Sequence, residues 1–234
     1  MKILGLDSSG LVASVAVVCD DNLMAEYTVN YKKTHSQTLL PMLDDVAKMI
    51  ELDLNTIDAV AVAGGPGSFT GLRIGSATAK GLGLALNKPI VSVPTVDALA
   101  YNLVGHQSLV CPLMDARRNQ TYTGLYEFCG NDMKVVREQC AVGIDEIIRA
   151  VNDTGKPAVF LGDGVPVFSG YIKENCSVPY TFAPAHLNKQ RAGAVAALGM
   201  KYYAEGRYET AAAHRPEYLR LSQAERERKE SENA

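Results

Sequence analysis

The chain has 234 residues, 47% of them hydrophobic, and a formal net charge of −3 with a pI near 5.8. This length can bury one large core or two lobes of about 100 residues, and the charge gives no basic surface for strong nucleic-acid binding. The five cysteines form no C-x-x-C pair, and no apolar run reaches the roughly 18 residues of a membrane span. We therefore expect a cytoplasmic protein with reduced thiols, no zinc and no signal peptide, in which any RNA role depends on partners.

The first half of the chain predicts a three-stranded meander followed by alternating helices and strands. A buried strand at 2–6 ends on Asp7, a second strand covers 11–19, and a third alternates apolar and polar residues at 25–29. The next elements are a helix at about 36–50, a strand at 59–63, a helix at 72–86, a strand at 90–93 and a helix at about 96–103.

The two early helices carry features of a contact surface. The helix at 36–50 is amphipathic, with Leu39 and Leu43 on its apolar side and Pro41 expected in its first turn. The helix at 72–86 has small residues at every fourth position, and glycine costs roughly 1 kcal/mol per helix position relative to alanine. Such a stripe therefore indicates a close contact, either with a partner helix or with the chain's own core. The small-residue stripe consists of Gly71, Gly75, Ala79 and Gly83.

The second half repeats the order of the first. A strand at 109–114 ends on Asp115, as the first strand ends on Asp7. We interpret this as duplication of a βββαβα unit, with chance as the alternative because the halves share little residue identity. The further repeated elements are strands at 121–128 and 134–142, a helix at 144–151, and a strand at 158–161 that runs into Gly162-Asp163-Gly164 as 59–63 runs into Gly64-Gly65.

Two lobes and a tail follow from this duplication. We expect a first lobe at 1–104, a smaller second lobe at 105–222, and a charged, disordered tail at 223–234. An apolar helix at 191–205 is a candidate to pack on the first lobe, and 216–220 is expected to be extended.

A glycine-rich loop at 64–75 joins a buried strand to a helix. Its glycines allow positive φ and close approach, and the helix N-terminus suits a phosphate or carboxylate. The loop is no Walker A motif, because Gly71-Leu72-Arg73 stands where Gly-Lys-Ser/Thr is required. It also fails the G-x-G-x-x-G spacing of dinucleotide-binding folds.

Two such lobes would face each other across a cleft containing Asp7, Asp115 and the glycine turns. This layout is similar to that of the actin, hexokinase and Hsp70 superfamily: an α/β protein of two duplicated RNase H-like lobes, with mixed sheets flanked by helices. A nucleotide with a metal would suit the cleft, whereas the simpler alternative is that both aspartates only cap turns. The candidates for weak nucleotide binding are Asp7, Gly65, Gly67, Ser68 and Asp115.

Several motifs make the resemblance more specific. Together they resemble the TsaB (YeaZ) family over nearly the whole chain, and the segment from Ser68 to Gly75 is the most distinctive. The motifs are Leu6-Asp7-Ser8-Ser9, His35-Ser36 with Leu39-Leu40-Pro41, Gly65-Pro66-Gly67-Ser68-Phe69-Thr70-Gly71-Leu72-Arg73-Ile74-Gly75, Ala79-Lys80-Gly81-Leu82, Asp115-Ala116-Arg117, and Pro216 with Tyr218-Leu219-Arg220.

The resemblance implies a non-catalytic scaffold or activating subunit. Its partner would be a TsaD-like subunit, which installs threonylcarbamoyl on the adenosine next to the anticodon of tRNA, with a TsaE-like ATPase in the same complex. tRNA would be contacted only through the complex. We expect no required cofactor and, at most, weak ATP or ADP binding. The sequence leaves open a homodimer through the helices at about 36–50 and 72–86. The expected interface residues are Leu39, Leu43, Gly71, Gly75, Ala79 and Gly83.

No catalytic set can be assembled from the sequence. The catalytic relatives bind metal through a His-x-x-x-His pair, but His35, His106, His186 and His214 contain no such pair, so no metal site is expected. No G-x-S-x-G nucleophile motif surrounds Ser68. An ATP-dependent phosphotransferase of the same superfamily remains the alternative, and a glycoprotein peptidase ranks last.

Overall fold

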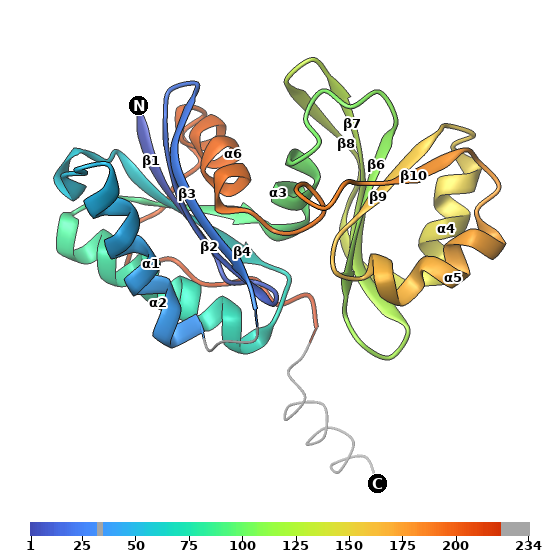
Figure 1. Ribbon diagram of the computed structural model, residues 1–234, viewed down its shortest axis with the longest axis horizontal. Coiled ribbons are helices and arrows are strands. Elements are labelled where there is room, and N and C mark those ends of the chain that lie inside the picture. Colours follow the sequence, from blue (N-terminus) through green and yellow to red (C-terminus); the bar gives the residue numbers. More distant parts are fainter. Residues whose placement is uncertain (32–34, 221–234) are drawn as a thin grey trace, which may run out of the picture.

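The computed structural model describes residues 1–31 and 35–220, which form two lobes, each on a five-stranded mixed sheet (Figure 1). The tail predicted at 223–234 lies outside these residues. No helix of the described part is long and apolar enough to cross a membrane. Lobe 1 contains β1 (Lys2–Asp7), β2 (Val12–Cys19), β3 (Asn22–Asn30), α1 (His35–Met49), β4 (Ala59–Gly65), α2 (Phe69–Leu86) and β5 (Ile90–Pro94). Lobe 2 contains β6 (Leu109–Asp115), β7 (Gln120–Cys129), β8 (Asp132–Gly143), α4 (Ile144–Asp153), β9 (Ala158–Leu161), α5 (Val165–Asn175) and β10 (Tyr180–Phe182).

The two sheets have the same strand order. The first runs β3-β2-β1-β4-β5, and the second runs β8-β7-β6-β9-β10. In each, the first strand pairs antiparallel with the second and parallel with the fourth. The predicted fold class and the duplicated strand order are therefore confirmed.

Helices cover both faces of each sheet and explain its apolar strands. In Figure 1, α1 and α2 cover the outer face of the first sheet, and α4 and α5 cover the outer face of the second. Two further helices, α3 (Thr95–Tyr101) and α6 (Ala192–Ala204), lie between the sheets. Central strands covered on both faces are apolar at successive positions, which is why β1 and β4 have continuous apolar sequences.

The inner helices link the lobes. Helix α6 lies far from lobe 1 in sequence but packs on β1, β2 and β4, whereas α3 follows lobe 1 and packs on β6 and β7. A Cβ atom on Gly199 of α6 would lie 2.6 Å from the Cβ of Ala61, and one on Gly5 would overlap the backbone of α6. These glycines allow the helix to approach the sheet closely.

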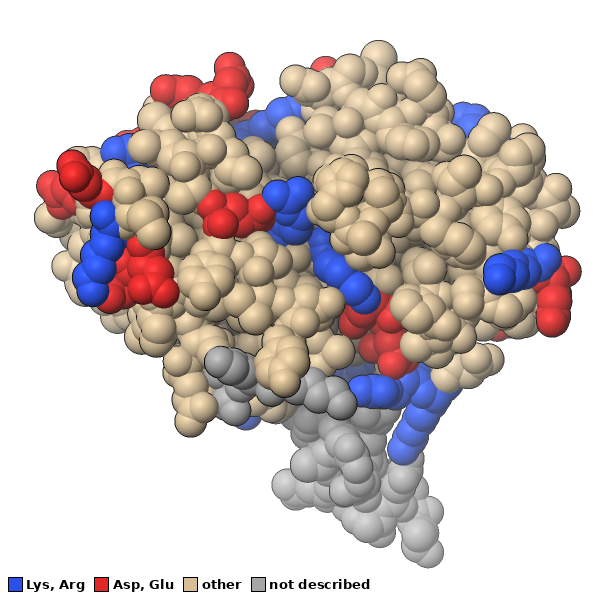
Figure 2. Space-filling view, viewed as in Figure 1, with Lys and Arg blue, Asp and Glu red and all other residues tan. Residues whose placement is uncertain are grey.

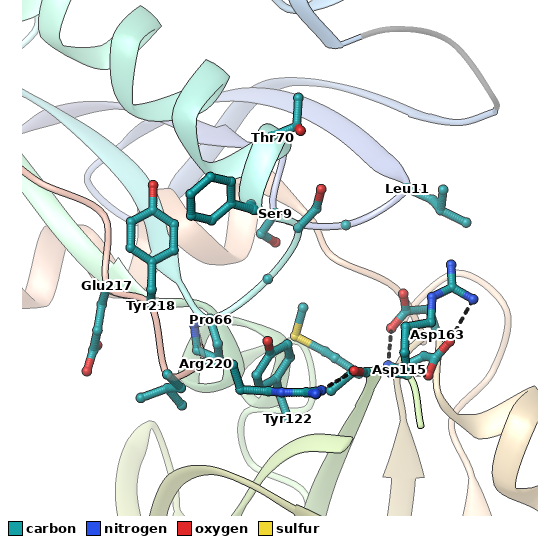
Figure 3. Close-up of a pocket in the computed structure, with 18 residues that line it drawn as sticks. Ser9, Leu11, Pro66, Thr70, Asp115, Tyr122, Asp163, Glu217, Tyr218 and Arg220 are labelled. Atoms are coloured by element: carbon teal, nitrogen blue, oxygen red, sulfur yellow. Dashed lines mark hydrogen bonds and ion pairs between the residues drawn. The ribbon is translucent and has the colours of Figure 1, made fainter. Parts of the chain in front are cut away.

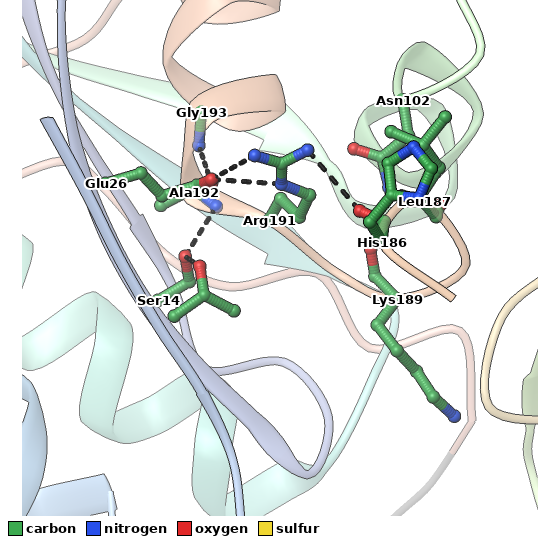
Figure 4. A network of polar contacts seen from close by, with 10 residues as sticks. Ser14, Glu26, Asn102, His186, Leu187, Lys189, Arg191, Ala192 and Gly193 are labelled. Atoms are coloured by element: carbon green, nitrogen blue, oxygen red, sulfur yellow. Dashed lines mark hydrogen bonds and ion pairs between the residues drawn. The ribbon is translucent and has the colours of Figure 1, made fainter. Parts of the chain in front are cut away.

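The N-terminus of α6 is held by side chains of lobe 1 (Figure 4). Glu26 of β3 accepts hydrogen bonds from the Gly193 N–H at 2.9 Å and from Arg191 Nε at 3.0 Å. Ser14 Oγ of β2 accepts one from the Ala192 N–H at 2.9 Å. These bonds satisfy N–H groups that have no partner within the helix, so they fix the register of α6 on the sheet.

A buried polar cluster joins α3, α6 and lobe 2. Asp97 of α3 accepts hydrogen bonds from the hydroxyls of Tyr126 at 2.7 Å and Tyr202 at 3.3 Å. Burial raises the pKa of Asp97 and the pKa of Tyr126. Since one carboxylate receives donors from β7 and α6, this cluster fixes the lobes against each other at α3.

One sequence prediction needs correction, and two elements were missed. Pro41 lies well inside α1 rather than in its first turn, because the helix already begins at His35. Helix α5 and strand β10 were not predicted. Helix α5 begins after Gly164, has Pro166 in its first turn and buries only Phe168 and Ile172. Strand β10 has only three residues. The periodic pattern of hydrophobic residues is therefore weak in both elements.

The contact between α6 and the first sheet is testable by exchanging glycine for alanine. We expect Gly199→Ala to lower the free energy of unfolding by about 1 to 3 kcal/mol, because its methyl group would overlap Ala61. Gly170→Ala in α5 is the matched control. Nothing lies within 4 Å of its added Cβ, so it should gain about 0.5 to 1 kcal/mol from helix propensity. Urea unfolding of both variants measures the difference, and equal stabilities would contradict the packing described.

Candidate functional site

A cavity of about 470 Å³ lies between the lobes (Figure 3). Its walls come from the β1–β2 turn, the glycine-rich loop, the β6–β7 turn and a C-terminal segment. A volume of this size is within the range of small-molecule sites. The segments concerned are 9–11, 66–70, 114–117 and 217–220, with Tyr122 and Asp163.

The aspartates predicted at the cleft make the same turn in each lobe. Asp7 Oδ1 accepts a hydrogen bond from the Ser9 N–H at 2.8 Å and from Ser9 Oγ at 2.7 Å. Asp115 Oδ1 accepts one from the Arg117 N–H at 2.8 Å. Both carboxylates therefore hold the turn that follows the first strand of their lobe, which is the simpler of the two roles considered from the sequence.

Asp7 is buried beneath the cleft and does not line the cavity. Burial raises its pKa from 3.8 to about 6, although the hydrogen bonds from Ser9 oppose this rise. Burial also raises the pKa of Asp163, which does line the cavity and accepts a hydrogen bond from the Asp115 N–H at 3.4 Å. The cleft thus has carboxyl groups from both lobes in poorly hydrated positions.

The glycine-rich loop packs against the β1–β2 turn of the same lobe. A Cβ on Gly67 would overlap the Ser9 carbonyl, and one on Gly71 would overlap the Ser8 carbonyl. The Ser68 N–H donates to the Ser9 carbonyl at 2.7 Å, while the Ser68 side chain caps α2 by accepting from the Gly71 N–H at 3.3 Å. The close approach that these glycines permit is therefore to the protein's own backbone.

The glycine turns after β4 and β9 correspond to each other. Gly65 has a φ of 118° and Gly162 a φ of 111°, values that residues with a side chain rarely adopt. An added Cβ would overlap the backbone of Glu217 in the first case and of Leu113 in the second. The similarity of the two turns in the sequence reflects this shared conformation.

The β6–β7 turn is strained and carries two arginines at the rim of the cleft. Arg117, Arg118 and Asn119 have φ values of 64°, 55° and 58°. Three successive left-handed residues with side chains are unfavourable. The carboxylate of Asp115 compensates, because it accepts from the Arg117 N–H and also lies 3.3 Å from its guanidinium. Asp115 is thereby committed to holding the turn.

Only part of the predicted nucleotide set lines the cavity. Gly67, Ser68 and Asp115 do, whereas Asp7 and Gly65 do not. Asp163 was missed as a site residue, although its place after a duplicated strand was a usable signal. Tyr122 and the segment 217–220 were also missed. Tyr218-Leu219-Arg220 had been noted as a family motif, but only the tertiary structure places the segment at the cleft.

The small-residue stripe faces the core of its own lobe, which corrects the predicted interface. A Cβ on Gly75 would lie 2.6 Å from Ser8 Oγ, and one on Gly83 would lie 2.9 Å from the Cβ of Ala211. The stripe permits this intramolecular packing. The six predicted interface residues, Leu39, Leu43, Gly71, Gly75, Ala79 and Gly83, are all buried.

In the described part of the chain, basic and acidic side chains lie close together on the surface, and possible metal ligands do not cluster. Figure 2 shows lysine and arginine side chains beside acidic ones along the junction of the lobes, on a face that is otherwise mostly uncharged. Among residues 1–31 and 35–220, no three His, Cys, Asp or Glu side chains come together as a metal site. His35 Nε2 instead contacts the Gly10 carbonyl at 2.8 Å.

The two duplicated lobes, each a five-stranded mixed sheet flanked by helices, have the actin/hexokinase-like fold. An Arthrobacter polyphosphate/ATP-glucomannokinase shares this fold with a TM-score of 0.51, at 11% identity over 87% of this chain and 99% of that chain. YeaZ from Pseudomonas aeruginosa is more similar, with a TM-score of 0.80 and 27% identity over 93% of this chain and 99% of that chain. The chain belongs to the TsaB (YeaZ) family, because a TsaB protein is 31% identical to it over 96% of each chain.

Sequence relatives support the same assignment. The tRNA threonylcarbamoyladenosine biosynthesis protein TsaB of Bacillus subtilis is 31% identical over 227 residues, covering 96% of each chain. Its Escherichia coli namesake is 33% identical over 150 residues, covering 63% of this chain and 64% of the relative. A family model described as TsaD, tRNA N6-adenosine threonylcarbamoyltransferase, matches residues 22–228.

The buried carboxyl of Asp7 predicts a specific pH dependence. Because its pKa is 3.8 in the unfolded chain and about 6 in the folded protein, folding favours the protonated form. The contribution of Asp7 to the free energy of unfolding is therefore fully present below pH 3.8 and is lost as the pH rises through about 6. Relative to Asp7→Asn, the parent chain should lose up to about 3 kcal/mol between about pH 4 and about pH 7.5. Urea unfolding at both pH values tests this, and parallel changes in both proteins would contradict it.

Proposed function

We propose that this chain is a non-catalytic subunit in tRNA threonylcarbamoyladenosine biosynthesis. In this role it pairs with a TsaD-like subunit, which modifies the adenosine next to the anticodon, and works in the cytoplasm with a TsaE-like ATPase. Contact with tRNA is made through the complex. Membership of the TsaB family and the match to the TsaD family model support the pathway.

The observation that carries the pairing is the outer face of α1 and α2. These helices pack side by side on the outside of lobe 1 (Figure 1). Leu40 of α1 and Leu84 of α2 are 52% and 64% exposed. Ala77 and Gly81 are also exposed and share a face of α2 with Leu84, since the three are four and three residues apart. Exposed apolar and small side chains on adjacent helices suit a partner helix.

The proposed interface lies on the exposed face of α2, beside the buried face that the sequence predicted. The residues predicted from the sequence pack inward and determine how α2 lies on the sheet. The exposed residues beside them are left to contact a partner. The face that we assign to the partner therefore consists of Leu40, Ala77, Gly81, Leu84 and Ala85.

The roles of the cleft residues support a non-catalytic subunit. Asp7 is buried and Asp115 holds the strained turn, so both have structural tasks. Catalysis needs a positioned base, nucleophile or metal, whereas Asp7 does not line the cavity and the Asp115 carboxylate is bound to its own turn. A phosphotransferase is the second candidate, because the cavity is large enough for a small substrate and has Asp163 and Asp115 on its wall.

We expect the purified chain to show no ATP hydrolysis, phosphotransfer or peptidase activity above buffer, because its acids hold turns. The measurement is release of phosphate from Mg-ATP, transfer of labelled phosphate to added sugars, and cleavage of a peptide library. Turnover in the parent chain that disappears in Asp115→Asn would favour the phosphotransferase.

The partner face can be tested at a position where a side chain does not disturb the fold. Nothing lies within 4 Å of a Cβ added to Gly81, so Gly81→Arg should fold normally. It places a long charged side chain in the proposed contact. Affinity for the TsaD-like subunit of the same organism should fall about 30-fold to 1000-fold by calorimetry.

Gly170→Arg on α5 is the matched control, since this glycine is also exposed, helical and open. It should leave affinity unchanged. Ala79→Arg is unsuitable, because Ala79 is fully buried and a charge there should lower the melting temperature by several degrees or more. Unchanged affinity in a folded Gly81→Arg protein would exclude this face.

A further inference from the structure

The chain returns to lobe 1 after α6 and follows it closely. Ile90 and Glu209 exchange two backbone hydrogen bonds, both of 2.9 Å. Lys80 Nζ donates to the carbonyls of Ala212 at 3.3 Å and His214 at 3.0 Å. Up to His214, the segment is therefore attached to lobe 1 alone.

Residues 216–220 then pass the mouth of the cleft while remaining attached to lobe 1 at its glycine-rich loop. The Glu217 N–H donates to the Gly64 carbonyl at 2.7 Å. The Tyr218 ring packs on Phe69 of α2 with 4.7 Å between centroids, and the Arg73 guanidinium lies 3.9 Å from the centroid of the Phe69 ring. These contacts place the segment beside the first turn of α2 (Figure 3).

Glu217 and Arg220 of this segment also contact lobe 2. Gln139 Nε2 of β8 donates to Glu217 Oε2 at 3.1 Å and to the Gly65 carbonyl at 3.3 Å. Arg220 donates to the carbonyl of Ala116 in the β6–β7 turn. Residues 216–220 thus connect the glycine-rich loop of one lobe to two elements of the other.

The contacts on the two sides of the cleft differ in kind. At α3 the lobes are joined by buried apolar packing and by the Asp97 cluster with two tyrosines. At the mouth, the connection to lobe 2 consists of hydrogen bonds that are exposed or only partly buried. Exposed hydrogen bonds open more readily than a packed core. The α3 side is therefore the axis, and the mouth is the side that can open.

We infer that residues 216–220 form a releasable clasp that holds the two lobes closed across the mouth of the cleft. The clasp moves with lobe 1, because its attachments there are more extensive. Breaking the bonds from Arg220 and Gln139 frees lobe 2 to rotate about α3. The opening of the cavity is then determined by the C-terminal segment, which forms part of its wall. This inference does not rest on the proposed partner or pathway.

The test measures the distance between the lobes in the full-length chain. Spin labels are attached through a ketone-bearing amino acid at positions 81 and 170, which are exposed, open to solvent and on different lobes, so that the native cysteines stay unlabelled. In the parent protein we expect a single distance distribution by double electron–electron resonance. In Arg220→Ala, the population at longer distance should rise at least about tenfold, as expected for loss of a hydrogen bond from a charged donor.

The matched control is Arg118→Ala in the β6–β7 turn. Like Arg220→Ala it removes one arginine, but in the described structure Arg118 has no hydrogen bond to residues 216–220. Its distribution should match that of the parent. The double variant Arg220→Ala with Gln139→Ala should be more open than either single variant. Circular dichroism confirms that each variant is folded. A folded double variant that keeps the parent distribution, or opening of equal size in Arg118→Ala, would overturn the clasp.

Discussion

The close packing of α6 on the first sheet is the contact on which the two-lobed structure depends. The helix follows lobe 2 in sequence, yet it covers β1, β2 and β4 of lobe 1, where Gly5 and Gly199 remove the side chains that would keep helix and sheet apart. Glu26 and Ser14 fix its N-terminus, and Tyr202 on the same helix reaches Asp97. With α3 packed on lobe 2, the inner helices make the lobes one interdependent core with a cleft on one side.

The cleft lies between two lobes of the actin/hexokinase-like fold, and the aspartate after the first strand of each lobe holds a turn. In both lobes an aspartate closes the turn after the first strand, and in lobe 2 that turn has three left-handed residues to stabilise. A carboxylate that accepts hydrogen bonds from its own turn is less available to a metal or a substrate. These structural tasks of the two aspartates support the non-catalytic role that we propose.

Local pattern predicted most of the fold, and it predicted the site only where the site repeats a local pattern. The continuous apolar strands, the amphipathic α1 and the duplicated order were all readable, and the glycine turns after β4 and β9 share a conformation as their sequences suggested. The stripe on α2 was recognised as a close contact, and the sequence left open whether a partner helix or the chain's own core makes it. Small residues show that something approaches closely, whereas only the tertiary structure shows that it is Ser8 and the neighbourhood of Ala211.

The sequence by itself determined the two α/β lobes, the paired aspartate turns and the family, because each depends on local periodicity or on residues close together in the chain. The tertiary structure alone decided which face of α2 is exposed and that residues 216–220 reach both sides of the cleft, whereas the sequence had already made the helix at 191–205 a candidate to pack on lobe 1. Each of these features joins segments more than a hundred residues apart or is determined by such a contact. The periodicity of hydrophobic residues predicts which side chains are buried, but it does not predict which surface they pack against.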